Sequence, residues 1–193
     1  MNWASESSSD VIAIQRWSDI AQREQLLPAL EVVFFEASGT KSFAGKADRQ
    51  AFRERWLGRY LEYDPQWAYL AFDANGKLAG YLIGSLEDPA RTPRFREIGY
   101  FKEFAALTVA YPAHLHVNLT PAYRNLGIGA KLIDTFAADA ARAGAKGVHV
   151  VTGGDARNIG FYVRNGFREL GRAKSNTNVV VFLGRRLSAA ETA

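Results

Sequence analysis

The segment from residue 113 to residue 143 places an alternating strand, a glycine-containing loop and an amphipathic helix in immediate succession. Residues 113–120 alternate apolar and polar side chains, which is typical of a β-strand with one buried face. Residues 127–143 carry apolar side chains at helical spacing, namely Ile128, Leu132, Ile133, Phe136 and Ala140. Gly127 and Gly129 stand where the loop enters the helix, so the backbone turns there without a covering side chain. The chain must therefore contain a β-loop-α unit whose loop backbone is accessible.

Hydrophobic periodicity elsewhere predicts further elements around this unit. The expected strands, besides 113–120, are 11–14, 67–72, 77–86, 147–152, 167–174 and 178–186. The expected helices, besides 127–143, are one from Ser18 or Asp19 to Ala37, kinked or split at Pro28, and those over 47–63, 101–107 and 157–165. Asp73-Ala74-Asn75-Gly76 predicts a hairpin turn. We expect an α/β (α+β) fold with a mixed, mostly antiparallel twisted sheet of about seven strands flanked by about four helices.

The composition is that of an ordinary globular domain. The 193 residues are 48% hydrophobic and 23% charged, with a formal net charge of +4, which does not indicate a nucleic-acid partner. We expect one domain over 10–187, with tails at 1–9 and 188–193. No apolar run is long enough to span a membrane, and residues 1–10 are polar. We therefore expect no signal peptide, no membrane partner and a cytoplasmic location, with monomer and homodimer both open.

The loop before the predicted helix at 127–143 has the character of a phosphate site. Exposed amides and the positive end of a helix dipole favour an anion. The spacing is not that of a Walker loop, and Leu132 stands where a dinucleotide-binding fingerprint needs its third glycine. The candidate phosphate-binding residues are Arg124, Asn125, Leu126, Gly127, Ile128, Gly129 and Ala130.

Two motifs together resemble a known superfamily. The Arg-x-x-Gly-x-Gly-Ala pattern of residues 124–130 resembles the coenzyme A pyrophosphate loop of the GNAT N-acetyltransferases. Residues 158–167, Asn-Ile-Gly-Phe-Tyr-Val-Arg-Asn-Gly-Phe, resemble a compressed form of that family's second motif. One helix and one strand separate the motifs, as in the family. The resemblance implies a GNAT-like domain that uses acetyl-CoA as cosubstrate, without a metal.

A narrower resemblance lies in the predicted strand. Residues 111–119, Tyr-Pro-Ala-His-Leu-His-Val-Asn-Leu, resemble the acetyltransferase-like domain of O-GlcNAc hydrolases and its free-standing bacterial counterparts. In those domains, catalytic groups of the wider superfamily are sometimes missing. Two functions follow as alternatives: direct acetyl transfer from acetyl-CoA to an amine of an unknown acceptor, or a non-catalytic acetyl-CoA-binding module with a sensing or partner-binding role.

The resemblance also implies residue roles. The backbone of Val117, Asn118 and Leu119 would pair with the pantetheine arm, and residues 124–130 would hold the phosphates. Asn158, Phe161 and Tyr162 would line the coenzyme, with the Tyr162 hydroxyl as general acid for the departing thiolate. The chain has no cysteine, which excludes a cysteinyl acyl-enzyme and agrees with direct transfer.

Candidates for the remaining roles come from the residue types. His116 is a candidate general base, because an imidazole titrates near neutral pH. Glu103 is a weaker candidate for the same role. His114 and Asp155 are candidate substrate contacts. His114 and His116 have no third ligand at a convincing spacing, so we expect no metal site.

Overall fold

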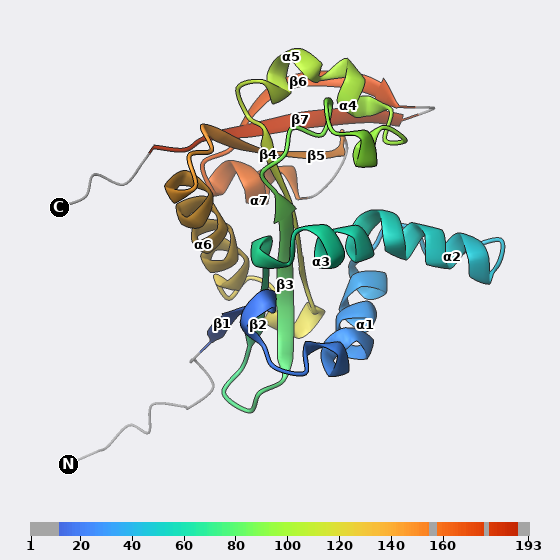
Figure 1. Ribbon diagram of the computed structural model, residues 1–193, viewed down its shortest axis with the longest axis vertical. Helices are drawn as coiled ribbons and strands as arrows, with labels where there is room; N and C mark the ends of the chain where they lie inside the picture. Colours follow the sequence, from blue (N-terminus) through green and yellow to red (C-terminus); the bar gives the residue numbers. More distant parts are fainter. Residues whose placement is uncertain (1–11, 155–157, 176–177, 189–193) are drawn as a thin grey trace. The chain divides into compact units, whose positions relative to one another are not determined.

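A computed structural model describes residues 12–154, 158–175 and 178–188 (Figure 1). The chain forms two compact units, one from residues 1–83 and 117–132 and the other from residues 84–116 and 133–193. The strands follow the order β1-β2-β3-β4-β5-β7-β6 in a seven-stranded sheet. The sheet contains both parallel and antiparallel pairs, so the predicted fold class is confirmed. The predicted domain limits at 9/10 and 187/188 stay a prediction.

The strands of the first unit are antiparallel. They are β1 (Ala13–Arg16), β2 (Ala68–Phe72) and the greater part of β3 (Leu78–Ser85). The predicted hairpin between β2 and β3 is confirmed, because the Gly76 amide donates to the Asp73 carbonyl over 2.9 Å. The Asp73 carboxylate accepts hydrogen bonds from the amides of Asn75 and Lys77, and Gly76 adopts φ +75°. The turn therefore uses the residue types that its geometry requires.

The helices of the first unit differ in part from expectation. They are α1 (Leu27–Ala37), α2 (Lys46–Arg53) and α3 (Arg59–Tyr63), with a π-helical turn at Glu54–Gly58 between the last two. The helix predicted from Ser18 or Asp19 to Ala37 is wrong over nearly its first half, because α1 begins only at Leu27 and Pro28 stands in its first turn. Proline has no amide hydrogen and is favoured where a helix starts. Short 3₁₀ turns occupy Trp17–Asp19 and Arg23–Leu26 instead.

The second unit contains the remaining strands and three short helices. The strands are β4 (Ala113–Leu119, shared with the first unit), β5 (Gly147–Gly153), β6 (Arg168–Ser175) and β7 (Asn178–Arg186). The helices are α4 (Tyr100–Glu103), α5 (Ala105–Thr108) and α7 (Ile159–Arg164). Strands β4 and β5 are parallel, whereas β5 with β7 and β6 with β7 are antiparallel.

Helix α6 (Ile128–Arg142) follows the β-loop-α unit that the sequence predicts. Its expected apolar face is confirmed, because all five predicted side chains are buried, namely Ile128, Leu132, Ile133, Phe136 and Ala140. The helix ends at Arg142, and Gly144 just beyond it adopts φ +86°. Glycine is the residue that takes this left-handed cap with least strain. Within the described ranges, no helix combines the length and apolarity that a membrane crossing requires.

Candidate functional site

Strand β4 becomes more exposed along its length. It is fourth of seven in the sheet order, so it has a neighbouring strand on each side. Residues 113–115 are buried, whereas residues 116–119 are only half-buried. Strand β4 pairs with β5 only near the start of both strands, where Ala113 lies opposite Val148 and His114 lies opposite His149. The second half of β4 therefore keeps part of its surface accessible, as a strand that binds a ligand must.

Asn118 uses its side chain inside the sheet. Its amide nitrogen donates to the Tyr81 hydroxyl over 2.8 Å. Tyr81 is fully buried, and burial raises the pKa of its hydroxyl well above the ordinary value. The Asn118 side chain is therefore engaged within the sheet, and the contact of its backbone with a pantetheine arm stays a prediction.

Two hydrogen bonds brace the loop that follows β4. The Tyr123 hydroxyl donates to the Asp73 carboxylate over 2.5 Å, which lowers the pKa of Asp73 and raises that of Tyr123. The Arg124 guanidinium donates through Nε to the Leu119 carbonyl over 3.2 Å. The turn between β2 and β3 therefore holds the loop in place through Asp73. Sequence reasoning missed Asp73 and Tyr123 as a pair, because 50 residues separate them.

Two residues of the loop adopt left-handed backbone conformations. Asn125 has φ 63° and Gly127 has φ 77°. Glycine and asparagine are the residues that enter this region with least strain. A Cβ at Gly127 would meet no atom within 4 Å, so open space lies beside this backbone. The loop is thus shaped to leave its backbone uncovered before α6 begins.

The first turn of α6 presents the features of an anion site. The first four amides of a helix have no acceptor within the helix, and here the ladder starts with Lys131 donating to the Gly127 carbonyl. The first turn has no acidic residue, and the positive end of the helix dipole lies at this end. Residues 124–127 are exposed, and Arg124 and Lys131 supply positive charge. Of the predicted phosphate-binding residues, 124–127 are therefore accessible, whereas Ile128 and Gly129 are buried in the first turn of the helix and Ala130 is half-buried. An exposed loop with positive charge at a helix start is a setting that favours an anion.

His114 lies in the core of the second unit and not on an accessible surface. It is 2% exposed. Its ring packs edge-on against Phe95 with centroids 4.8 Å apart, and it also contacts Phe101 and His149. Burial lowers its pKa well below the ordinary value, so the ring is neutral. The prediction that His114 contacts substrate does not fit this placement, because residues before β4 fold over that face of the strand.

His116 lies where β4 begins to be exposed. It is half-buried, and desolvation of its ring lowers its pKa to about 4. At neutral pH the ring is therefore uncharged and able to accept a hydrogen bond, as a general base must. A pKa this low also makes it a weak proton acceptor.

Helix α7 presents the second motif. Tyr162 is buried, with ring contacts to Phe161 and Phe167, and burial raises the pKa of its hydroxyl. The hydroxyl therefore stays protonated at neutral pH, as a proton donor requires. Asn158 is exposed just before the helix, and its side-chain oxygen Oδ1 accepts a hydrogen bond from the Thr152 hydroxyl over 3.0 Å.

The other candidates are placed as follows. Asp155 lies outside the described residues. Glu103 is exposed at the end of α4. The loop residues 124–130 belong to the first unit, whereas His116, Asn158 and Tyr162 belong to the second. In the part of the chain that the structure covers, no three His, Asp or Glu side chains gather in a way that would hold a metal ion.

Comparison with known proteins bears on the family and on the fold. Residues 35–167 match the model of the Acetyltransferase (GNAT) family. The crystal structure of SsHAT is similar, with a TM-score of 0.69 and 22% identity over 92% of this chain and 98% of that one. A chain of the NatC complex, crystallised with Gag peptide and CoA, gives a TM-score of 0.61 and 15% identity over 92% and 99%.

The ribosomal-protein-S18-alanine N-acetyltransferase from Escherichia coli is also similar in fold. It gives a TM-score of 0.58 and 16% identity over 95% of this chain and 99% of that one. These identities are low, so the structures establish the fold, and the family match establishes the membership. That match spans more than half of the sequence. The chain belongs to the GNAT acetyltransferase family.

Proposed function

We propose that this protein binds acetyl-CoA and transfers its acetyl group directly to an amine. The observation that carries the proposal is the loop of residues 124–127, where Asn125 and Gly127 take left-handed conformations beside open space. Such a loop in front of a helix lets backbone amides approach a pyrophosphate closely. The residues present therefore fit the coenzyme that this family uses.

The chemistry needs groups that hold the thioester and move protons. Acetyl-CoA supplies an activated acetyl group, so that a carbon–nitrogen bond forms as the carbon–sulfur bond breaks. The backbone of residues 117–119 would hold the pantetheine arm, and residues 124–130 would bind the phosphates. Tyr162 would donate its proton to the departing thiolate, since burial raises its pKa and so keeps the hydroxyl protonated until the thiolate forms. His116 would accept the proton that the amine loses.

Thiol release tests the proposal. With acetyl-CoA and a panel of small amines and amino-terminal peptides, we expect saturable release of free thiol that depends on the amine. In Tyr162→Phe the ring packing is kept and the hydroxyl is lost, so we expect turnover to fall about 10- to 100-fold with little change in acetyl-CoA affinity. Unchanged turnover in that variant would remove Tyr162 from the mechanism. A protein with no saturable acetyl-CoA binding in calorimetry would overturn the proposal itself.

The pH dependence tests the role of His116. Because its pKa is about 4, the ring is neutral from pH 5.5 to 8 and loses no proton across that range. We therefore expect the ratio of the wild-type rate to the His116→Gln rate to be constant from pH 5.5 to 8. Activity that depends on neutral His116 would be lost only as the pH falls toward 4. A ratio that declines on acidification with a midpoint near pH 6.5 would contradict this account.

The second candidate function is acetyl-CoA binding without catalysis. One observation favours it: residues 113–119 contain no carboxylate, and His116 is a weak base. The resemblance of residues 111–119 to the acetyltransferase-like domain of O-GlcNAc hydrolases supports the same alternative. Saturable acetyl-CoA binding without thiol release for any amine would select this function over transfer.

A further inference from the structure

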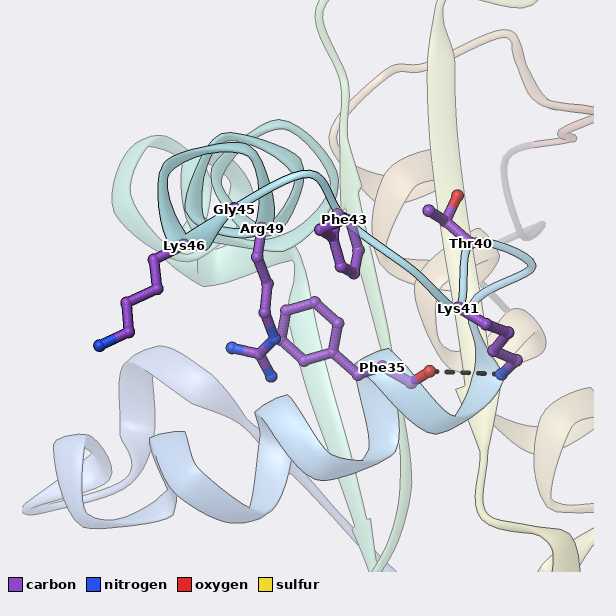
Figure 2. Close-up of a pocket in the computed structure, with 7 residues that line it drawn as sticks. All are labelled: Phe35, Thr40, Lys41, Phe43, Gly45, Lys46 and Arg49. Atoms are coloured by element: carbon purple, nitrogen blue, oxygen red, sulfur yellow. Dashed lines mark hydrogen bonds between the residues drawn. The ribbon is translucent and has the colours of Figure 1, made fainter.

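An open surface cavity of about 400 Å³ lies in the first unit, between the end of α1 and the start of α2 (Figure 2). It has the size of a small-molecule site. Seven residues line it, and none of them is acidic: Phe35, Thr40, Lys41, Phe43, Gly45, Lys46 and Arg49. The acetyl-transfer residues assigned above do not line it. The wall therefore combines aromatic surface with positive charge, and no lining carboxylate offsets that charge.

The aromatic part of the wall is held in place by contacts with neighbouring phenylalanine rings. Phe35 and Phe43 meet edge-on, with ring centroids 5.9 Å apart. Phe43 also contacts Phe52 of α2 at 5.3 Å, and Phe52 contacts Phe34 of α1 at 5.5 Å. Phe34 is buried, whereas Phe35 and Phe43 are half-buried. Two rings are thus fixed by the core and keep part of their surface for an apolar ligand.

Arg49 is the cation best placed to hold an anion here. Its guanidinium carbon lies 3.5 Å from the centroid of the Phe35 ring, so the group is stacked and oriented (Figure 2). Among the described residues, Arg49 forms no ion pair with a carboxylate. Arg53, one turn further along α2, is instead paired with Glu31 and Glu54. Arg49 therefore presents unused donors in the fork geometry that suits an oxyanion.

The two lysines add to the positive potential in different ways. Lys41 donates to the carbonyls of Phe35 and Glu36 at 3.4 and 2.8 Å, which fixes its ammonium at the rim of the cavity. In Figure 2, Lys46 extends away from the two rings, so it contributes charge at longer range. An anionic ligand would therefore meet Arg49 first and Lys41 second.

We propose that this cavity binds a small organic anion that joins a flat apolar body to a terminal carboxylate or phosphate group. The apolar body would lie against Phe35 and Phe43, and the oxyanion would accept hydrogen bonds from Arg49. The chemistry is shared by aromatic carboxylates and aromatic phosphate esters. The proposal concerns binding alone, so it does not depend on acetyl transfer.

Chemical-shift titration of the ¹⁵N-labelled protein tests the site. Phenylacetate and phenyl phosphate are expected to cause saturable shifts at the amides of residues 40–49. Phenylacetamide, which is neutral, and inorganic phosphate, which has no ring, should each bind at least about 10-fold more weakly. The tighter of the two anions identifies the source of the ligand, a carboxylate or a phosphate ester. Equal binding of phenylacetate and phenylacetamide, or of phenyl phosphate and inorganic phosphate, would overturn the proposal.

Variants separate this site from the acetyl-CoA loop. Arg49→Gln should weaken binding of the better anion at least about 10-fold, and Phe43→Leu should weaken it about 5-fold while keeping an apolar core contact. Lys146→Gln removes an equal charge from an exposed position outside the cavity and should change nothing. Gly127→Glu should leave this binding intact, so failure of either proposal is distinguishable from failure of the other. Shifts that persist unchanged in both Arg49→Gln and Phe43→Leu would exclude the cavity as the site.

Discussion

Replacing Gly127 with Glu is expected to weaken acetyl-CoA binding by at least about 100-fold. The substitution places a negative charge and a bulky side chain in the open space beside the loop, where the pyrophosphate is proposed to lie. It also imposes a side chain on a backbone with φ 77°, which L-residues rarely adopt. Isothermal titration calorimetry with acetyl-CoA measures the effect directly. An affinity within about 3-fold of the wild type would refute the placement of the pyrophosphate.

Gly144→Glu is the matched control for that experiment. Gly144 stands at the other end of α6, with φ 86° and no atom within 4 Å of its Cβ position. The control therefore introduces the same charge and a similar backbone strain, and it should cost a comparable amount of stability. We expect it to bind acetyl-CoA with wild-type affinity. A loss of binding in both variants would assign the effect to strain or net charge and not to the loop.

The β-loop-α unit was predictable because its signals are local. Alternation in residues 113–120, the glycines of the loop and the apolar stripe of α6 each lie within a few residues of one another. The hairpin at Asp73–Gly76 was predictable for the same reason, since its hydrogen bonds close within four residues. Local chemistry therefore determines these elements almost completely.

The errors and omissions have a different physical origin. The sequence predicts too long a first helix, because Pro28 is compatible both with a kink inside a helix and with a helix start, and tertiary packing selects between them. Strand alternation places His114 opposite Leu115, on the face that carries His116, and so makes it a candidate ligand contact. The alternating pattern carries no information on the packing of Phe95 and Phe101 against the His114 ring, because these residues are distant in sequence. The contacts of Asn118 with Tyr81 and of Tyr123 with Asp73 join distant residues, so no pattern in the sequence indicates them.

Gly84→Ala is expected to destabilise the protein by about 3 kcal/mol, the upper part of the range for an overpacked core. A Cβ at Gly84 would lie 2.6 Å from the His114 carbonyl oxygen and 2.6 Å from Cε2 of Phe136. The carbonyl belongs to the backbone of β4, and Phe136 is fully buried, so neither yields easily. The cost corresponds to a fall in Tm of about 6–12 °C for a chain of this length.

Gly99→Ala supplies the comparison for this measurement, because a Cβ at Gly99 meets no atom within 4 Å and its φ of −56° suits any residue. We expect it to change the free energy of unfolding by less than about 0.5 kcal/mol in urea denaturation. A Gly84→Ala protein as stable as Gly99→Ala would show that β3 and β4 separate easily at His114. In that case, the close approach of these two strands would not explain why His114 is buried. It would also not explain why the half-exposed segment begins at His116. The predicted difference therefore tests the packing that limits the accessible part of β4 to residues 116–119.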